Sequence, residues 1–221
     1  MNIEVAVRER ISVRAFLDKP VSRETIAQLF ETVRWAPSAA NLQPWYVAVV
    51  SGDRKQRISD QVIQAVESGV GPHPNFPYYP NKWVEPYRSR RFRCGMALYN
   101  AIGIKRDDTE RRRQIWNENY RFFGAPIGLF FFMGKNTGHG AWIDMGIFLQ
   151  TVMLAAKELG LGTCPQASLA DYPDIVKKEL DVPEDWILVC GMSLGYPDDQ
   201  APINQYRTER MSVNDFLKWY D

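Results

Sequence analysis

The sequence predicts a single α+β domain, and three observations support that prediction. Two short and strongly apolar runs, 45–50 and 127–133, have the length and composition of strands. Longer segments around them carry apolar residues at helical spacing, so helices and strands alternate along the chain. At 221 residues, 45% of them hydrophobic, the chain can bury a large core without disulfide or metal support. We therefore expect a mixed sheet flanked by helices.

The first periodic helix should begin after Ser22, a residue type that caps helices well. Pro37 should end this helix, because the residue before a proline is pushed out of helical geometry. The run 45–50 is then expected to form a buried strand, and Asp53 is placed to cap the next helix. The apolar face of the first helix consists of Ile26, Leu29, Phe30 and Val33.

The middle of the chain begins with a segment, 69–87, that holds five prolines and several aromatic residues. Such a composition predicts an ordered loop or lid rather than a linker. Two polar helices are expected over 88–102 and 108–121, followed by the buried strand at 127–133.

A long helix over 141–160 is apolar on most of its sides, which places it in the core or at a subunit interface. Gly160 should terminate it. A short helix at 172–180, a strand at 186–195 and a short C-terminal helix starting near Ser212 should complete the fold.

Composition excludes several classes of protein. Basic and acidic residues nearly balance, 27 against 26, so no charge excess indicates nucleic-acid binding. Three cysteines without a CxxC pair argue against a disulfide framework and a zinc site. The N-terminal segment MNIEVAVRER lacks the apolar core of a signal peptide, and the longest apolar run, 127–133, is too short to span a membrane. We expect a soluble, cytoplasmic protein that binds neither nucleic acid nor a membrane.

Composition also limits the chemistry. The chain has two histidines, and it contains no GxSxG, HExxH or GxxxxGK[ST] motif. No group of residues in the sequence therefore indicates acid–base or nucleophilic catalysis by side chains. If the protein is an enzyme, we expect a cofactor to carry the difficult step.

The densest cluster of polar residues is RERISVRAF, 8–16. If this segment is extended, Arg8, Arg10, Ser12 and Arg14 share one face. Alternating guanidinium and hydroxyl groups suit a phosphate and a second polar edge of the same ligand. The alternative is a solvated edge without a ligand.

Three further segments could contribute to such a site. In APSAANLQPW, 36–45, Asn41 and Gln43 offer both donors and acceptors, which the edges of heteroaromatic rings require. An ordinary loop is the alternative there. In LGTCPQASL, 161–169, backbone amides near Gln166 could face a ligand, whereas Cys164 is expected to be a buried filler rather than a nucleophile.

The last of these segments is NQYRTERMS, 204–212. It brings Arg207 and Arg210 close to the C-terminal helix. Both could bind an anion, and both could equally be surface charges paired with Glu209.

Six segments, taken in this order, together resemble the nitroreductase family of flavoenzymes over about residues 5–217. They are ERISVRAF, APSAANLQPW, FFGAPIGLFFF, GAWIDMGIFLQTVMLAAKELGLGTCPQ, CGMSLGYPD and RTER. The resemblance implies a mixed, mostly antiparallel sheet flanked by helices in an intertwined homodimer. It also implies one FMN-binding domain over 1–221, in which 69–123 form an inserted loop-and-helix segment over the active site.

The resemblance further implies an activity. Members hold FMN at the subunit interface, reduce it with NADH or NADPH and follow a ping-pong cycle. Within the family, the chain most resembles bacterial enzymes that reduce nitrobenzene or nitrobenzoate to the hydroxylaminoarene. The alternatives are a flavin or quinone reductase on the same scaffold, a flavin-binding protein without turnover, and a small module that binds a protein partner through its aromatic loop.

Site residues follow from the same resemblance. Arg10, Ser12 and either Arg207 or Arg210 match residues that hold the FMN phosphate, and Arg14 matches a cation near the flavin N1–C2=O edge. Pro37, Ser38 and Asn41 match a loop from the other subunit, while Pro165 and Gln166 match the segment whose backbone amide meets flavin N5. Ile11 and Val13 belong to the binding segment, but position 11 is basic or His in many members, so no side-chain contact is expected from Ile11.

Two roles in this set have a physical basis. Hydride transfer to N5 leaves negative charge at the N1–C2=O edge, where a fixed cation such as Arg14 would stabilise it.

Planar aromatic substrates should stack in an apolar pocket, for which the candidates are Phe76, Tyr78, Tyr79, Phe122 and Phe123. Core filling is the alternative for Phe122 and Phe123. The arginines at 88, 90, 91 and 93 could attract a carboxylated substrate, although a solvated helix face is the commoner role.

Overall fold

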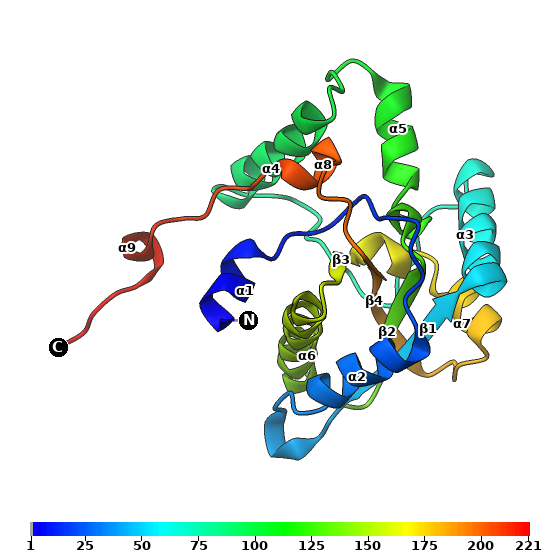
Figure 1. Ribbon diagram of the computed structural model, residues 1–221, viewed down its shortest axis with the longest axis horizontal. Coiled ribbons are helices and arrows are strands. Elements are labelled where there is room, and N and C mark those ends of the chain that lie inside the picture. The colour runs from blue at the N-terminus through cyan, green and yellow to red at the C-terminus, as the bar shows by residue number, and fades with distance from the viewer. Residues whose placement is uncertain (1) are drawn as a thin grey trace.

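The centre of the molecule is a four-stranded sheet with the order β1–β2–β4–β3 (Figure 1). The structure is a computed structural model that describes residues 2–221. Every pairing of neighbouring strands is antiparallel, and parallel pairing is confined to one isolated bridge between Ser12 and Thr163. The predicted α+β class is confirmed. The strands are β1 (Trp45–Ser51), β2 (Ile127–Gly134), β3 (Gly162–Gln166) and β4 (Trp186–Gly195).

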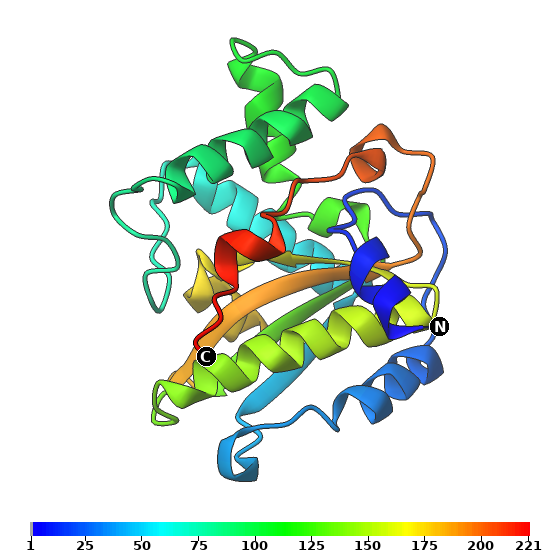
Figure 2. The ribbon, with the colours of Figure 1, turned by 90° about the vertical axis from the view of Figure 1, so that its left-hand side faces the viewer.

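Helices cover both faces of this sheet (Figure 2). Side chains of β2 alternate, so Leu129 and Phe131 meet α2 and α6, whereas Phe130 and Phe132 meet α3 and α7. The helices are α1 (Ile3–Glu9), α2 (Arg23–Val33), α3 (Gly52–Glu67), α4 (Tyr87–Ala101), α5 (Thr109–Asn117), α6 (Gly140–Glu158), α7 (Pro173–Leu180), α8 (Pro202–Gln205) and α9 (Val213–Phe216). Three short 3-10 turns are η1 (Ala39–Asn41), η2 (Phe122–Gly124) and η3 (Ala167–Ala170).

The two apolar runs that predicted strands differ in burial. In β2 the residues from Ile127 to Met133 are all buried, as predicted, because β1 and β4 flank this strand and helices cover its two faces. The prediction of a buried strand is wrong for β1. It lies at the edge of the sheet, where Tyr46 is 49% and Val49 46% exposed.

The predicted helix starts are partly correct. Ser22 caps α2, because its side chain accepts a hydrogen bond of 3.1 Å from the Thr25 amide. The cap predicted at Asp53 is wrong. Helix α3 begins one residue earlier, at Gly52, so Asp53 lies in the first turn and acts only through the helix dipole.

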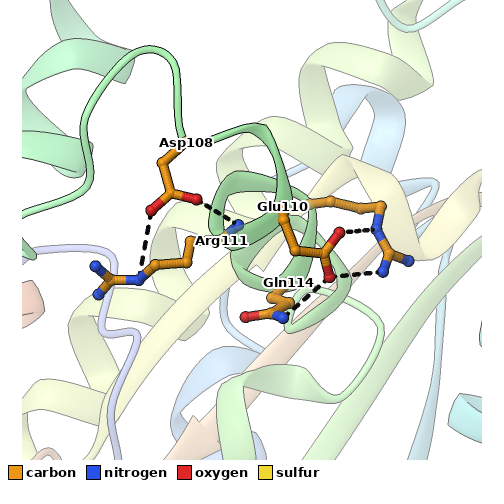
Figure 3. Close-up of polar contacts among 5 residues, drawn as sticks. Asp108, Glu110, Arg111 and Gln114 are labelled. Carbon is orange, nitrogen blue, oxygen red and sulfur yellow. Dashed lines mark hydrogen bonds and ion pairs between the residues drawn. The ribbon is translucent and has the colours of Figure 1, made fainter.

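Helices α4 and α5 form a lobe that stands away from the sheet (Figures 1 and 2). Helix α4 has no buried residue, so its polar composition agrees with its position. Helix α5 is organised by local contacts between the side chains of its own first turns (Figure 3). Asp108 accepts from the Arg111 amide at 3.1 Å, and Glu110 pairs with Arg113 at 2.8 Å. These contacts fix the start of α5 without tertiary packing.

The proline-rich segment 69–87 contains no helix until α4 begins, and it is attached to the rest of the fold by specific contacts. Strand β3 pairs with β4 only as far as Gly191. In the part of β4 that β3 does not cover, the Leu188 amide donates to Asn75 Oδ1 at 3.0 Å. The Tyr172 hydroxyl donates to the Val70 carbonyl at 2.8 Å. His73 Nε2 lies 2.5 Å from Asp174 Oδ1.

None of the helices within residues 2–221 combines the length and apolarity that a bilayer span requires.

Candidate functional site

The predicted polar segment runs beside strand β3. The Val13 amide donates to the Thr163 carbonyl at 2.9 Å, which fixes residues 10–14 as extended chain. Gly162 permits this approach, since a Cβ there would lie 2.7 Å from Val13 Cγ2. Because Val13 is buried, the alternating residues Arg10, Ser12 and Arg14 point to the other side, as predicted.

Arg8 does not belong to this row. It lies in helix α1 and forms an exposed ion pair with Glu4 at 3.0 Å. The alternation expected over 8–14 therefore begins only at Arg10, where α1 ends.

Strand β3 brings Cys164 against the polar row. The thiol is buried, and burial raises its pKa, while the charges of Arg14 and Arg10 and a hydrogen bond with Ser12 act in the opposite direction. A buried thiol with a raised pKa is a poor nucleophile, which agrees with the predicted role of Cys164 as a filler. Arg14, Ser12 and Arg10 thus all lie close enough to Cys164 to affect its pKa.

Arg14 is held on several sides. Its backbone amide donates to Asn204 Oδ1 at 2.8 Å. Its guanidinium Nη1 donates to the Tyr206 hydroxyl at 3.1 Å and to the Ser12 carbonyl at 3.3 Å. The guanidinium carbon also lies 5.7 Å from the centre of the Phe123 ring. Every one of these partners is uncharged.

Asn204 ties this region together from the C-terminal side. It is 5% exposed, and its Nδ2 donates to the carbonyls of Ala15 and Asp198, both at 2.8 Å. Neither Asn204 nor Tyr206 was among the predicted site residues. The segment NQYRTER contains both, but only its arginines carry a recognisable chemistry.

Arg10, Arg207 and Arg210 form a cluster of positive charge. Burial lowers the pKa of the Arg10 guanidinium, and the nearby charges of Arg210 and Arg207 lower this pKa further. Within residues 2–221, no carboxylate forms an ion pair with Arg10 or Arg207. Guanidinium groups that converge without an acidic partner are suited to an oxyanion such as a phosphate. The donor set therefore fits the phosphate of FMN.

A cavity of about 590 Å³ borders this cluster. Arg207 and Arg210 line it together with Arg93 of α4. The pairing of Glu209 with Arg207 or Arg210, which was the alternative from the sequence, is not present. Glu209 pairs with Arg93 at 3.5 Å, and Arg210 Nη1 instead donates to the Thr208 hydroxyl at 2.7 Å.

Gln166 contributes to the fold through its side chain. Its Nε2 donates to the Asn119 carbonyl at 2.7 Å, and its Oε1 lies 2.6 Å from the hydroxyl of buried Ser193. Only the backbone at this position can therefore face a ligand. Pro165 and Gln166 end β3, which is an edge strand, and edge strands leave backbone groups unpaired on their outer side.

The loop at 36–45 lies apart from these residues. Figures 1 and 2 both place it on the N-terminal half of α6, whereas α1 and the segment after it lie at the other end of that helix. A helix of 19 residues is about 28 Å long. Exposed Pro37 and Asn41 and half-buried Ser38 therefore do not join Arg14 within one chain.

This loop has an unusual backbone. Ala40, Asn41 and Gln43 have φ angles of 49°, 56° and 49°, in the left-handed region that favours glycine. Ser38 Oγ accepts from the Gln43 amide at 2.9 Å, and Asp144 Oδ1 accepts from the Ala39 amide at 3.1 Å. These bonds hold the loop in a conformation that its residues do not prefer.

The predicted aromatic lining divides into separate places. Phe122 is fully buried and packs edge-on against Phe130, so core filling, the alternative for this residue, is what the structure contains. Phe123 is 8% exposed and lies beside Arg14. Phe76 packs on Trp142 near the start of α6, with a ring distance of 4.4 Å. Tyr78, 50% exposed, lies next to it.

Comparison with known proteins gives consistent results. The model of the family described as "Nitroreductase family" matches residues 7–196. The nitrobenzene nitroreductase of Ectopseudomonas oleovorans is 37% identical over 215 residues, covering 97% of this chain and 95% of that protein. The 4-nitrobenzoate reductase of Pseudomonas putida is 36% identical and covers 97% and 94%. The crystal structure of the FMN and NADPH-dependent nitroreductase NfnB from Sphigopyxis sp. strain HMH is 40% identical, covers 100% of both chains and has a TM-score of 0.97.

Proposed function

The chain belongs to the nitroreductase family, and from this we propose that it is an FMN-dependent oxidoreductase that uses NADPH or NADH to reduce nitroaromatic compounds. Nitrobenzene and nitrobenzoate are the proposed substrate types, since relatives that act on them match nearly the whole chain. The proposed products are hydroxylaminoarenes, formed in two successive ping-pong cycles, because the reduction takes four electrons and each nicotinamide supplies one hydride.

One observation carries this proposal. Three segments far apart in sequence, 10–14, 162–166 and 204–210, meet at one place and bring uncompensated guanidinium groups with them. We assign Arg10, Arg207 and Arg210 to the phosphate of FMN, with Ser12 beside them. This donor set has the charge and the planar N–H groups that a phosphate binds.

FMN would supply the redox chemistry, since it takes a hydride from the reduced nicotinamide and passes it to the nitro group. The remaining work falls to the protein. Arg14 would hold positive charge where the ring becomes negative, and the backbone of Gln166 would orient the ring without adding a titratable group. Phe123 beside Arg14 would exclude water and so strengthen the interaction of the cation with the ring. Ile11 and Val13 belong to the same segment, but buried Val13 serves to fix it.

We further propose that the active unit is a homodimer. In one chain, the loop with Pro37, Ser38 and Asn41 is bonded to the N-terminal half of α6, whereas the segment with Arg14 runs beside β3, which follows the C-terminal end of α6. We therefore expect this loop to reach FMN only on a second subunit. The surface around this loop is apolar and open. Trp35 is 82%, Leu42 51% and Ile143 of α6 70% exposed, which is unusual for the surface of a monomer.

The C-terminal tail supports the same assembly. Figure 1 shows the tail leaving the body of the molecule after α8, and in Figure 2, viewed from that side, the tail lies in front of the rest of the chain. Its large apolar residues are exposed, with Trp219 at 81% and Tyr220 at 93%. We propose that this tail wraps a second copy. In the same dimer, segment 69–123 would act as a lid, with Phe76 and Tyr78 lining the substrate pocket of the neighbouring site.

The direct test is a visible spectrum of the purified protein, followed by NADPH and NADH additions under argon and titration with nitrobenzene and 4-nitrobenzoate. We expect a yellow protein that is bleached by the nicotinamide and regains its colour with the nitroarene. A protein that binds FMN but is not bleached would be a flavin-binding protein without turnover. Reoxidation by free flavin or quinone alone would identify the other reductase class, and a colourless protein after FMN addition would contradict the proposal.

The location of the protein follows from the same chemistry. Reduced nicotinamides are the electron donors, and all three cysteines are free thiols in the structure. Both features are typical of the cytoplasm, which is where we propose the protein acts.

A further inference from the structure

We propose that Tyr206, supported by Asn204, is a positioning residue that holds Arg14 with uncharged groups only, so that the guanidinium keeps its full charge for the ring of FMN. This inference rests on the proposed function, because it assigns a means by which Arg14 performs the role given above. It goes further in naming two residues outside the predicted site. It also gives a reason for their chemistry.

The geometry places both residues in contact with Arg14 from the C-terminal side. Tyr206 directly follows α8, and its hydroxyl accepts from Arg14 Nη1 at 3.1 Å. Asn204 lies inside α8 and binds the backbone on either side, accepting from the Arg14 amide and donating to the Ala15 carbonyl, both at 2.8 Å. One short helix thus fixes the backbone and the side chain of the same arginine.

The choice of partners matters because a half-buried arginine such as Arg14 could also be held by a carboxylate. A carboxylate would fix the guanidinium equally well, but it would also cancel most of the field that the arginine exerts on a ligand. Here the partners are a phenol, a backbone carbonyl and an aromatic ring. Burial raises the pKa of the Tyr206 phenol, although the charge of Arg14 opposes this shift, so the hydroxyl stays neutral at physiological pH.

The arrangement also explains how a flexible side chain can act at a fixed point. An unrestrained arginine samples many rotamers, and its average field at any one atom is correspondingly weaker. Two hydrogen bonds from the same Nη1 and the nearby Phe123 ring restrict the guanidinium, and its Nε and Nη2 groups form no hydrogen bond with the described residues. Tyr206 is therefore expected to influence FMN without touching it.

The test measures the midpoint potential of FMN bound to the full-length holoenzyme. A cation near the ring binds reduced FMN more tightly than oxidised FMN and so raises this potential. We expect Arg14→Ala to reduce the preference for reduced FMN about tenfold, which corresponds to about 30 mV for a two-electron couple. Tyr206→Phe removes only the hydroxyl, and we expect a loss of about threefold, or about 14 mV.

A second variant separates position from charge. Tyr206→Glu keeps an acceptor for Arg14 but introduces a negative charge, so we expect the potential to fall as far as it does in Arg14→Ala. The double variant Arg14→Ala/Tyr206→Phe should match Arg14→Ala alone, because Tyr206 acts through the arginine. Tyr46→Phe is the matched control, since Tyr46 is 49% exposed on edge strand β1 and loses the same atom.

Three outcomes would overturn the inference. If Arg14→Ala lowers the potential but Tyr206→Phe does not, the proposed role of Arg14 stands and Tyr206 has no part in it. If Tyr206→Phe has the same effect in the absence of Arg14, the tyrosine acts independently. If Arg14→Ala leaves the potential unchanged, the role of Arg14 under the proposed function fails, and that of Tyr206 fails with it. FMN affinity and thermal unfolding of each variant show whether the fold is intact.

Discussion

The two ends of helix α6 differ in how completely one chain covers them. At the C-terminal end, Lys157 pairs with Glu9 at 3.1 Å, and the segment after α1 then runs along β3. Asn204 closes this end with a set of short hydrogen bonds. At the N-terminal end, Ile143 and the loop at 36–45 are exposed. One chain thus supplies the contacts at the C-terminal end of α6 itself, whereas the N-terminal end stays exposed.

The open end shows a further sign of incompleteness. Asp144 is 4% exposed and accepts from the Ala39 amide through Oδ1, yet its Oδ2 is buried and, among the described residues, finds no hydrogen-bond partner. Left-handed residues, exposed apolar side chains and a half-satisfied carboxylate occur together here. The contrast with the closed end indicates where a second subunit should bind, and the following changes test it.

The largest effect should come from a charge placed at the open end. Ile143→Asp would bury a carboxylate in the proposed dimer interface, so we expect dimer dissociation to be favoured at least about 100-fold, or about 2.8 kcal/mol. Analytical ultracentrifugation and the yellow colour would report it together. Val49→Asp is the control, since Val49 of β1 is also exposed, at 46%, but belongs to neither loop 36–45, α6, the C-terminal tail nor segment 69–123. A variant that stays dimeric and yellow would contradict the proposed interface.

The closed end should be sensitive to loss of Asn204. Asn204→Ala removes three hydrogen bonds and leaves buried backbone groups without partners, so we expect the free energy of unfolding to fall by about 3 kcal/mol. Urea unfolding of the protein measures this. Asn119→Ala loses one hydrogen bond, to the Trp116 carbonyl, and should cost less than about 1 kcal/mol. Equal losses of unfolding free energy in the two variants would contradict the role assigned to the three hydrogen bonds of Asn204.

Arg10 and Arg8 give a sharper comparison within the closed end. Arg10→Ala should weaken FMN binding about 10- to 100-fold, because a charge-assisted bond to the phosphate is lost. Arg8, two residues earlier, is paired with Glu4 on exposed α1, so Arg8→Ala should leave the affinity nearly unchanged. Fluorescence titration of the apoprotein with FMN distinguishes them. Similar affinities for the two variants would remove Arg10 from the phosphate site.

The smallest effect concerns the attachment of loop 69–87. Hydrogen bonds to the Gly71 carbonyl and to Asp174 raise the pKa of His73. Protonated His73 therefore stabilises the attachment of this loop fully below about pH 6.5, and this stabilisation is lost as the pH rises through the raised pKa of His73. Burial raises the pKa of nearby Asp171 to about 6, so this group stays mostly ionised above about pH 6.5.

We accordingly expect amide hydrogen exchange in residues 69–76, corrected for intrinsic rates, to accelerate between about pH 6.5 and about pH 8.5. His73→Gln keeps a side-chain hydrogen bond but does not titrate, so the change should disappear in this variant. Acceleration of equal size in His73→Gln would assign the effect to another group.

Periodicity predicted the core well, because burial there follows from local pattern. Strand β2, and Leu29 and Val33 of α2, lie where alternation and helical spacing place them. The same reasoning failed for β1, because an apolar run does not reveal whether a strand has one neighbour or two. The prediction that Asp53 caps α3 failed for a similar reason. Several residues near a helix start can serve as the N-cap, and tertiary packing decides among them.

The site was predictable where the chemistry of a residue type is distinctive. Arg10 and Arg14 could be proposed as site residues because alternating guanidinium groups are conspicuous in the sequence. Asn204, Tyr206 and Asp144 were missed, because their roles depend on partners more than 100 residues away in sequence. An amide or a phenol has many ordinary uses, and only three-dimensional proximity shows which one applies.

The bridge between Ser12 and Thr163, together with the bonds from Asn204 to Arg14, has a consequence for biosynthesis. A nascent polypeptide can build its sheet as soon as β4 has left the ribosome, but Arg14 lacks its bonds to Asn204 and Tyr206 until α8 and the residue after it have emerged. Flavin should therefore bind productively only once residues 204–210 are in place. A truncation between the end of β4 and position 204 should yield a folded but colourless product, and such a fragment would separate the assembly of the scaffold from the loading of its prosthetic group.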